Sequence, residues 1–281
     1  MIVGGMELTR LGLAKKPVYA VPKGVLGQFQ REFLQAYPRA RILVADSSDL
    51  TGERRHQFVA RWSTGNWDAV IISHTAFKKI PMSKAARLDY INQEVKRLEA
   101  HLDNADGGDK YTVKDIENQI ATLKGRIEDE LKTPGDSGVE FERTGSTYIF
   151  YDEAHTLKNL RVISSIRELA LEGNQITADM DMKLSYLRKN YGGRVTTQAT
   201  ATPVDNSPME ILTAIKYNAP DLLRDEWGIE EDDQFVSTFI QPVNRVEMSP
   251  DGNSFSTRAR YARYVNQTEL KRVLSGSSSA P

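Results

Sequence analysis

Residues 148–155 read YIFYDEAH, an apolar and aromatic run followed by two adjacent acids. The apolar run has the length of a buried strand, so Asp152 and Glu153 are expected at its carboxyl end. Open α/β sheets bind their ligands at the carboxyl ends of their strands. The stretch therefore predicts a ligand site at the end of a buried parallel strand.

Short apolar strands alternate with helical segments on both sides of this stretch. Strands are expected at 18–21, 41–45, 69–73, 147–151 and 194–199, and helices at 1–14, 25–36, 52–63, 157–171 and 182–190. Further helices are expected after Pro208, and 243–248 with 256–261 can form a hairpin. This alternation predicts an α/β fold with a parallel sheet flanked by helices.

A different pattern occupies the middle of the chain. Apolar residues recur at spacings of three and four in two stretches, Leu88, Ile91, Val95, Leu98 and Leu102, then Val113, Ile116, Ile120, Leu123 and Ile127. The first stretch has the spacing of a heptad seam, and a polar turn at 103–110 separates it from the second. The pattern predicts an inserted antiparallel helical hairpin over 83–132, which we expect to project from the sheet domain.

These patterns divide the chain into four parts. The first part of the sheet lobe is expected at 1–81, the hairpin insertion at 82–140 and the rest of the lobe at 141–225. A C-terminal extension follows at 226–281, with a flexible tail from Ser275.

Composition excludes several classes of protein and site. The chain has 281 residues and is 40% hydrophobic, which is enough for a sizeable core. It has no cysteine, so disulfides, thiolate metal sites and cysteine nucleophiles are excluded. No segment approaches the roughly 18 consecutive apolar residues of a membrane span, and no signal peptide is evident. We expect a soluble, cytoplasmic protein with no membrane partner.

Charge is unevenly distributed although the net charge is −1. Residues 1–81 contain twelve Lys or Arg and six Asp or Glu. A basic first third could contact phosphates, but ordinary solvated surface charges would give the same count.

The acid pair has a specific chemical interpretation. In a nucleotide-driven motor one acid holds Mg²⁺, which bridges the β- and γ-phosphates, and Asp152 suits this role. A second acid, close to the metal but not on it, can orient and deprotonate the attacking water, and Glu153 suits that role. Two acids after a strand can also simply mark the first turn of a helix, where the helix dipole stabilises negatively charged side chains.

Four stretches together resemble the motifs of superfamily 2 Swi/Snf-type helicases and DNA translocases, in the order in which that family carries them. They are 21–26 (VPKGVL, motif Ia), 68–77 (DAVIISHTAF), 152–159 (DEAHTLKN, the DEAH-box motif II) and 199–206 (ATATPVDN, motif III). The likeness covers about residues 1–225 and implies the first RecA-like lobe of an ATP- and Mg²⁺-dependent motor. It is strongest to the helicase region of large phage and plasmid proteins that also carry a DNA methyltransferase, so we expect a bacterial or phage-infected cell.

The resemblance has departures and gaps. Ala201 stands where the family has glycine, and Asp205 where it has glutamine. The phosphate-binding pattern G-x-x-x-x-G-K-[ST] is missing, since the dipeptide Gly-Lys occurs nowhere. We expect a chain that starts after this loop and ends before the second RecA-like lobe with its arginine finger. Such a chain would bind ATP and Mg²⁺ weakly or not at all and would be inactive alone.

Candidate DNA contacts lie at two expected strand ends. Pro22, Lys23 and Gly24 lie between a strand and a helix, where a lysine and helix-end amides can hold a phosphate. Ser73, His74 and Thr75 offer polar groups at the next strand end, although His74 could instead be a buried structural histidine. Contacts of this kind position a DNA backbone without reading its sequence.

The resemblance also assigns residues near the nucleotide. His155 is implied near the γ-phosphate, although a histidine at a helix start often only packs. Thr200 and Thr202 are implied to contact the nucleotide site together with Asp152 and Glu153, coupling hydrolysis to movement on DNA.

Three functions remain open from the sequence. The first is the motor lobe just described, completed by a second lobe. The second is a non-catalytic module in which the basic face docks DNA and the 83–132 hairpin recruits a protein partner. The third is a nuclease that uses metal on the acids directly, for which no further ligand spacing is recognisable.

Overall fold

The computed structural model describes residues 1–104, 110–132, 140–166, 168–202, 204–205, 207–248 and 255–278. Its centre is a parallel sheet of five strands in the order β2-β3-β1-β4-β5. The strands are β1 (Val18–Val21), β2 (Ile42–Ala45), β3 (Ala69–Ser73), β4 (Ile149–Tyr151) and β5 (Thr196–Gln198). Every residue of β1, β3 and β4 is buried, as expected for strands covered on both faces.

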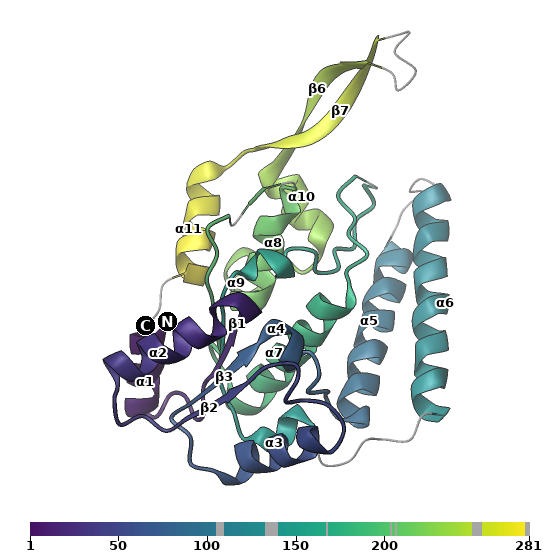
Figure 1. Cartoon of the computed structure of the whole chain (residues 1–281). Coiled ribbons are helices and arrows are strands. Elements are labelled where there is room, and N and C mark those ends of the chain that lie inside the picture. The colour runs from purple at the N-terminus through teal and green to yellow at the C-terminus, as the bar shows by residue number, and fades with distance from the viewer. Residues whose placement is uncertain are drawn as a thin grey trace.

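Helices cover both faces of the sheet. Alternate strand residues point to opposite sides, and the residues on both sides are apolar. Tyr19 and Val21 pack in one apolar cluster with α1 (Ile2–Arg10) and α2 (Leu26–Ala36). Val18 and Ala20 pack in another with α3 (Glu53–Thr64) and α7 (Gln175–Tyr191). The predicted α/β fold with a parallel sheet between helices is confirmed (Figure 1).

The inserted helical hairpin is present, but it does not stand away from the body. It consists of α5 (Lys84–Asn104) and α6 (Lys110–Lys132), which lie side by side in Figure 1; 105–109, most of the predicted turn, lie outside the described residues. Val95 and Leu98 are buried in a cluster that includes Ile163 of the body. Tyr90 Oη donates a hydrogen bond of 3.0 Å to Asp181 on α7. The expectation of a projecting hairpin was wrong because α5 buries polar and apolar groups against the body.

The C-terminal part builds a second apolar cluster beside the sheet domain. It comprises α8 (Met209–Asn218), α9 (Pro220–Trp227), α10 (Asp232–Phe239), β6 (Ile240–Met248), β7 (Phe255–Tyr264) and α11 (Gln267–Ser278). The predicted strand hairpin is confirmed as β6–β7, and its expected turn lies outside the described residues. The expectation of a flexible tail from Ser275 was wrong, because α11 continues to Ser278. Leu270 and Val273 of this helix are buried.

The predicted helix at 157–171 does not form. A short 3₁₀ helix, η3 (Ala154–Leu157), is followed by irregular chain with an isolated bridge between Val162 and Leu171. The amides of Ile163 and Ser165 donate to the carboxylates of Asp232 and Asp233 on α10, at 2.9 and 2.8 Å. Side chains distant in the sequence thus replace the carbonyl partners that a helix would supply.

Other differences concern element ends. Helix α7 starts seven residues before the predicted Met182, because Asn174 Oδ1 accepts from the amides of Ile176 and Thr177 and caps it there. Helix α1 ends at Arg10 rather than at residue 14. Three more short elements complete the described chain: η1 (Lys23–Val25), after β1, α4 (His74–Phe77), after β3, and η2 (Phe141–Thr144), before β4.

Candidate functional site at the carboxyl edge of the sheet

The carboxyl ends of the five strands gather predicted site residues along one edge, together with Asp46, which was not predicted. Asp46 follows β2, and His74 follows β3. Lys23 follows β1, Asp152 follows β4 and Thr200 follows β5. Because the strands are parallel, segments far apart in the sequence meet at one edge.

The acid pair lies on a backbone turn that the sequence did not reveal. Asp152 N donates to Ala20 O of β1 at 2.9 Å, which ties the first acid to the neighbouring strand. Glu153 has φ 51° and ψ 52°, the left-handed region that residues other than glycine rarely occupy. A strained backbone of this kind costs about 1–3 kcal/mol and is most often found at functional sites.

His155 and His74 occupy different environments beside the acids. His155 Nδ1 lies 3.1 Å from Glu153 Oε2, and both side chains are about half exposed. The ring of His74 stacks on Tyr151, with centroids 4.3 Å apart and an angle of 8°. Burial lowers the pKa of His74, although the nearby Asp152 acts in the opposite direction. His74 is therefore held as a largely neutral ring packed against β4.

The segment after β5 is fastened to the acid pair by main-chain hydrogen bonds. Ala199 N donates to Tyr151 O at 2.9 Å, and Ala154 N donates to Ala199 O at 2.8 Å. Thr200 is half buried, and its Oγ1 accepts from the amide of Thr202, which is exposed. The structure thus brings Thr200 beside the acids, while Pro203 and Asn206 of this segment lie outside the described residues.

Glu210, which was not predicted from the sequence, connects the DEAHTLKN stretch (152–159) to the segment after β5 (199–206). Its Oε2 lies 3.2 Å from Nζ of Lys158, near the end of DEAHTLKN, and accepts from Asp205 N at 2.6 Å. The side chains of Glu210 and Lys158 are only 4% and 13% exposed. An acid within the apolar run of α8 was the available signal, since buried charges are nearly always paired.

The proposed DNA contacts divide into exposed and internal groups. Lys23 and Gly24 are exposed, as is Thr75, while Pro22 and His74 are half buried. Ser73 is fully buried; its Oγ donates to Asp46 at 2.7 Å and caps α4 by accepting from Ala76 N. The Ser73 hydroxyl is therefore occupied within the fold.

Lys23 has an acidic partner. Lys23 Nζ lies 2.9 Å from Asp46 Oδ2. The hydrogen bond from Lys23, with others from Ser47 N and Ser73, lowers the pKa of Asp46 to about 2. The Lys23 side chain nevertheless remains 67% exposed, so its ammonium can still reach an external phosphate.

The metal chemistry open to this site is limited. Among the described residues, no group of three His, Cys, Asp or Glu side chains could hold a metal ion by itself. Asp152 is a single half-buried carboxylate at a strand end. This suits Mg²⁺, which commonly binds through one or two carboxylates together with substrate phosphates and water.

Comparisons with known proteins agree with this geometry. A family model described as "probable helicase domain" matches residues 1–276. The chain belongs to this family. Over 104 residues it is 34% identical to "Defense against restriction protein B" of Escherichia phage P1. That alignment covers 35% of the chain and 5% of the phage protein, so the chain spans a small part of its relative. No solved structure matches the chain.

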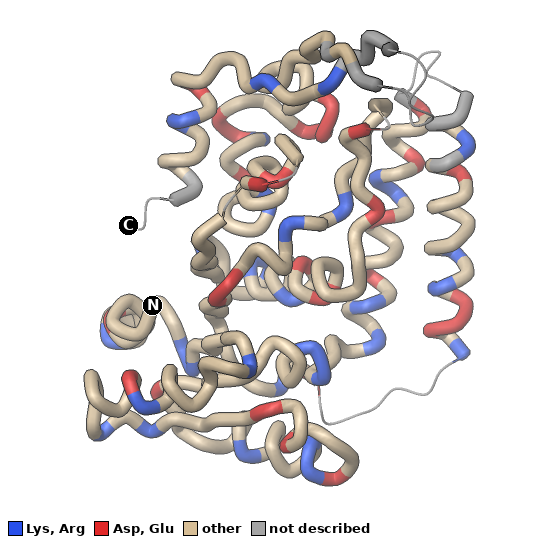
Figure 2. Tube along the Cα trace, turned by 45° about the horizontal axis from the view of Figure 1, so that its top comes forward, with Lys and Arg blue, Asp and Glu red and all other residues tan. Residues whose placement is uncertain are grey.

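Two further properties of the helicase domain are the distribution of its charged residues and the character of its helices. Figure 2 shows Lys and Arg distributed over many elements and interspersed with Asp and Glu. Within the described part of the chain, no helix is long and apolar enough to cross a membrane.

Proposed function

We propose that this helicase domain forms the first RecA-like lobe of an ATP-driven DNA translocase of the Swi/Snf type. The observation that carries the proposal is the acid pair at the end of β4, joined by main-chain hydrogen bonds to β1 and to the segment after β5. The other motor parts, a phosphate-binding loop and a second lobe, would come from the rest of a longer protein. The name of the phage P1 relative refers to restriction, a process that cleaves DNA, and this favours DNA over RNA.

Each residue of the site has a role under this proposal. Asp152 would hold Mg²⁺ together with the nucleotide, and the chemistry the ion would supply there is to offset charge that develops on the transferred group. Glu153 would accept a proton from the attacking water. His155, 3.1 Å from Glu153, would hold that carboxylate in place. Thr200 would transmit changes at the acids along the rest of the segment after β5.

We expect Glu153→Gln to abolish ATP turnover in a protein that joins this chain to a phosphate-binding loop and a second lobe. Replacing a general base typically lowers kcat by about 10²–10⁴-fold. Phosphate release with and without DNA measures the effect, and the isolated chain is expected to release none above background.

A matched control for this variant is Glu172→Gln, which removes the same charge from an exposed position outside the site. It should leave turnover unchanged. Equal turnover by the Glu153→Gln variant and the parent protein would remove Glu153 from the mechanism.

We expect Lys23→Glu to weaken duplex DNA binding by the chain equally for two unrelated sequences, because a phosphate contact carries no sequence information. The dependence of log Kd on log salt should fall by about 1, since one phosphate is no longer neutralised. Fluorescence anisotropy at several salt concentrations measures both quantities.

The control for this variant is Asp46→Asn, which breaks the same ion pair but keeps the lysine. Removing an acid beside Lys23 should leave affinity unchanged or raise it. If Asp46→Asn weakens binding as much as Lys23→Glu does, the effect comes from the broken ion pair and not from a contact between Lys23 and DNA.

A further inference from the structure

The strands β6 and β7 form a ribbon with no third strand in the described sheet. They have nine and ten residues and extend away from the body at the top of Figure 1. At about 3.4 Å per residue the ribbon is roughly 30 Å long. An isolated two-stranded hairpin is at best marginally stable in water, so the ribbon depends on its attachment to the body.

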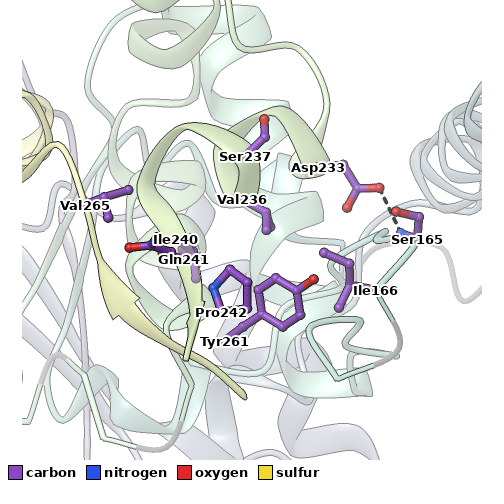
Figure 3. Close-up of a pocket in the computed structure, with 10 residues that line it drawn as sticks. All are labelled: Ser165, Ile166, Asp233, Val236, Ser237, Ile240, Gln241, Pro242, Tyr261 and Val265. Carbon is purple, nitrogen blue, oxygen red and sulfur yellow. Dashed lines mark hydrogen bonds between the residues drawn. The ribbon is translucent and has the colours of Figure 1, made fainter. Parts of the chain in front are cut away.

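The end of the ribbon nearest the body, residues 240–242 of β6 and 260–264 of β7, forms its foot and is attached by several contacts. Ile240 is buried, and Tyr264 Oη donates to Pro208 O at 3.1 Å. Val265 N donates to Phe239 O at 2.9 Å, just beyond the end of β7. The ring of Tyr261 lies beside Pro242 at a pocket of about 660 Å³ between the ribbon and α10 (Figure 3). The two tyrosines of β7 are thus used to seat the ribbon, and its direction is fixed by the body.

The ribbon is basic in an otherwise nearly neutral chain. Strand β7 has the sequence FSTRARYARY, with three arginines and no acid, and β6 adds Arg245 and one acid, Glu247. The antiparallel register places Arg245 opposite Arg258 and Gln241 opposite Arg263. Like charges directly opposite each other destabilise a strand pair. An anionic partner would offset the positive charge that this register concentrates on the ribbon.

Not every arginine of the ribbon is available to a partner. Arg260 Nη1 lies 3.3 Å from Glu168 Oε1 and belongs to the foot. Arg263 is exposed. The other arginines of the ribbon, Arg245, Arg258 and Arg263, are the ones that we assign to a partner.

We infer that the β6–β7 ribbon is a second nucleic-acid contact of this domain, which binds the phosphate backbone of duplex DNA. The major groove of DNA is about 12 Å wide and admits a two-stranded ribbon. Arginine binds phosphate through a planar, two-pronged set of donors. The inference rests on the proposed function for its choice of nucleic acid, but it concerns residues remote in sequence from the strand-end contacts at Lys23.

The test is a triple variant, Arg245→Ala, Arg258→Ala and Arg263→Ala, in the full chain. Binding to a fluorescent duplex of about 30 base pairs and arbitrary sequence is followed by anisotropy at several salt concentrations. The slope of log Kd against log salt should fall by about 3, one for each phosphate that is no longer neutralised. Kd at low salt should rise at least about tenfold, equally for a second sequence. The unfolding temperature of the variant is measured alongside and should stay close to that of the wild type, so that lost binding is not confused with lost folding.

The matched control removes three positive charges from α6, as Lys114→Ala, Arg126→Ala and Lys132→Ala. This variant should bind DNA like the wild type. Equal weakening in both variants would mean that only net charge matters, and wild-type binding by the ribbon variant would overturn the inference directly. If the ribbon variant binds normally while Lys23→Glu is weakened, the inference fails and the proposed function stands. If the wild-type chain binds no duplex at all, both DNA contacts are wrong, and the Glu153→Gln experiment still decides the motor.

Discussion

Glu210→Ala is expected to lower the free energy of unfolding by about 3–5 kcal/mol, because it leaves the buried ammonium of Lys158 without its partner. The two side chains are 4% and 13% exposed, so water cannot readily replace the missing carboxylate. The same substitution removes the acceptor for the amide of Asp205. Urea denaturation followed by circular dichroism measures the effect.

Two further variants identify the cause of this destabilisation. Replacing both partners, as Lys158→Met with Glu210→Met, should cost less than Glu210→Ala alone, because no charge is then left buried. Asp221→Ala breaks an exposed pair with Arg224 and should change stability by less than about 1 kcal/mol. Lys158→Met and Glu210→Met are also measured separately. If the double variant loses as much free energy of unfolding as the two single variants together, the ion pair contributes nothing.

This ion pair also has a functional meaning. It links the end of DEAHTLKN to the segment after β5 through α8. Under the proposed function, a change at the acid pair would be passed to α8, whose apolar residues Met209, Ile211, Leu212 and Ile215 pack in the C-terminal apolar cluster. A variant that keeps the fold but loses this link should separate nucleotide binding from movement on DNA.

The sheet was predictable because its signals are local. Four of the five strands, β1 to β4, are apolar runs with their own boundaries, and the YIFYDEAH stretch contains both a strand and the acids that follow it. The hairpin helices were predictable for the same reason, since the spacing of their apolar residues defines them. The site residues Asp152 and Thr200 could then be placed at one edge, because parallel strands align their carboxyl ends.

The remaining features depend on partners distant in sequence. The 157–171 stretch has enough apolar residues for a helix, but Asp232 and Asp233 bind its amides instead. Nothing in the sequence pairs Lys23 with an acid until the fold brings Asp46 within 2.9 Å. The left-handed turn at Glu153 has no signal in the residue type, since an unstrained chain would place glycine or asparagine there.

Leu98→Ala is expected to destabilise the whole domain by about 2–5 kcal/mol, the usual cost of a cavity at a fully buried leucine. Leu98 lies on α5, in the apolar cluster that joins the inserted hairpin to Ile163 of the body. The hydrogen bond between Tyr90 and Asp181 strengthens the same interface. We therefore expect the hairpin and the body to unfold together.

Tryptophan fluorescence can distinguish unfolding of the body from unfolding of the hairpin. The chain has three tryptophans, Trp62, Trp67 and Trp227, and none lies in the hairpin, so their emission reports on the body alone. Leu98→Ala should shift the fluorescence transition in urea as much as the circular dichroism transition. Leu131→Ala, at a position 60% exposed on α6, should shift neither by more than about 0.5 kcal/mol. If Leu98→Ala leaves the fluorescence transition in place while part of the helical signal is lost earlier, the hairpin folds as a separate unit and its contacts with α7 do not stabilise the body.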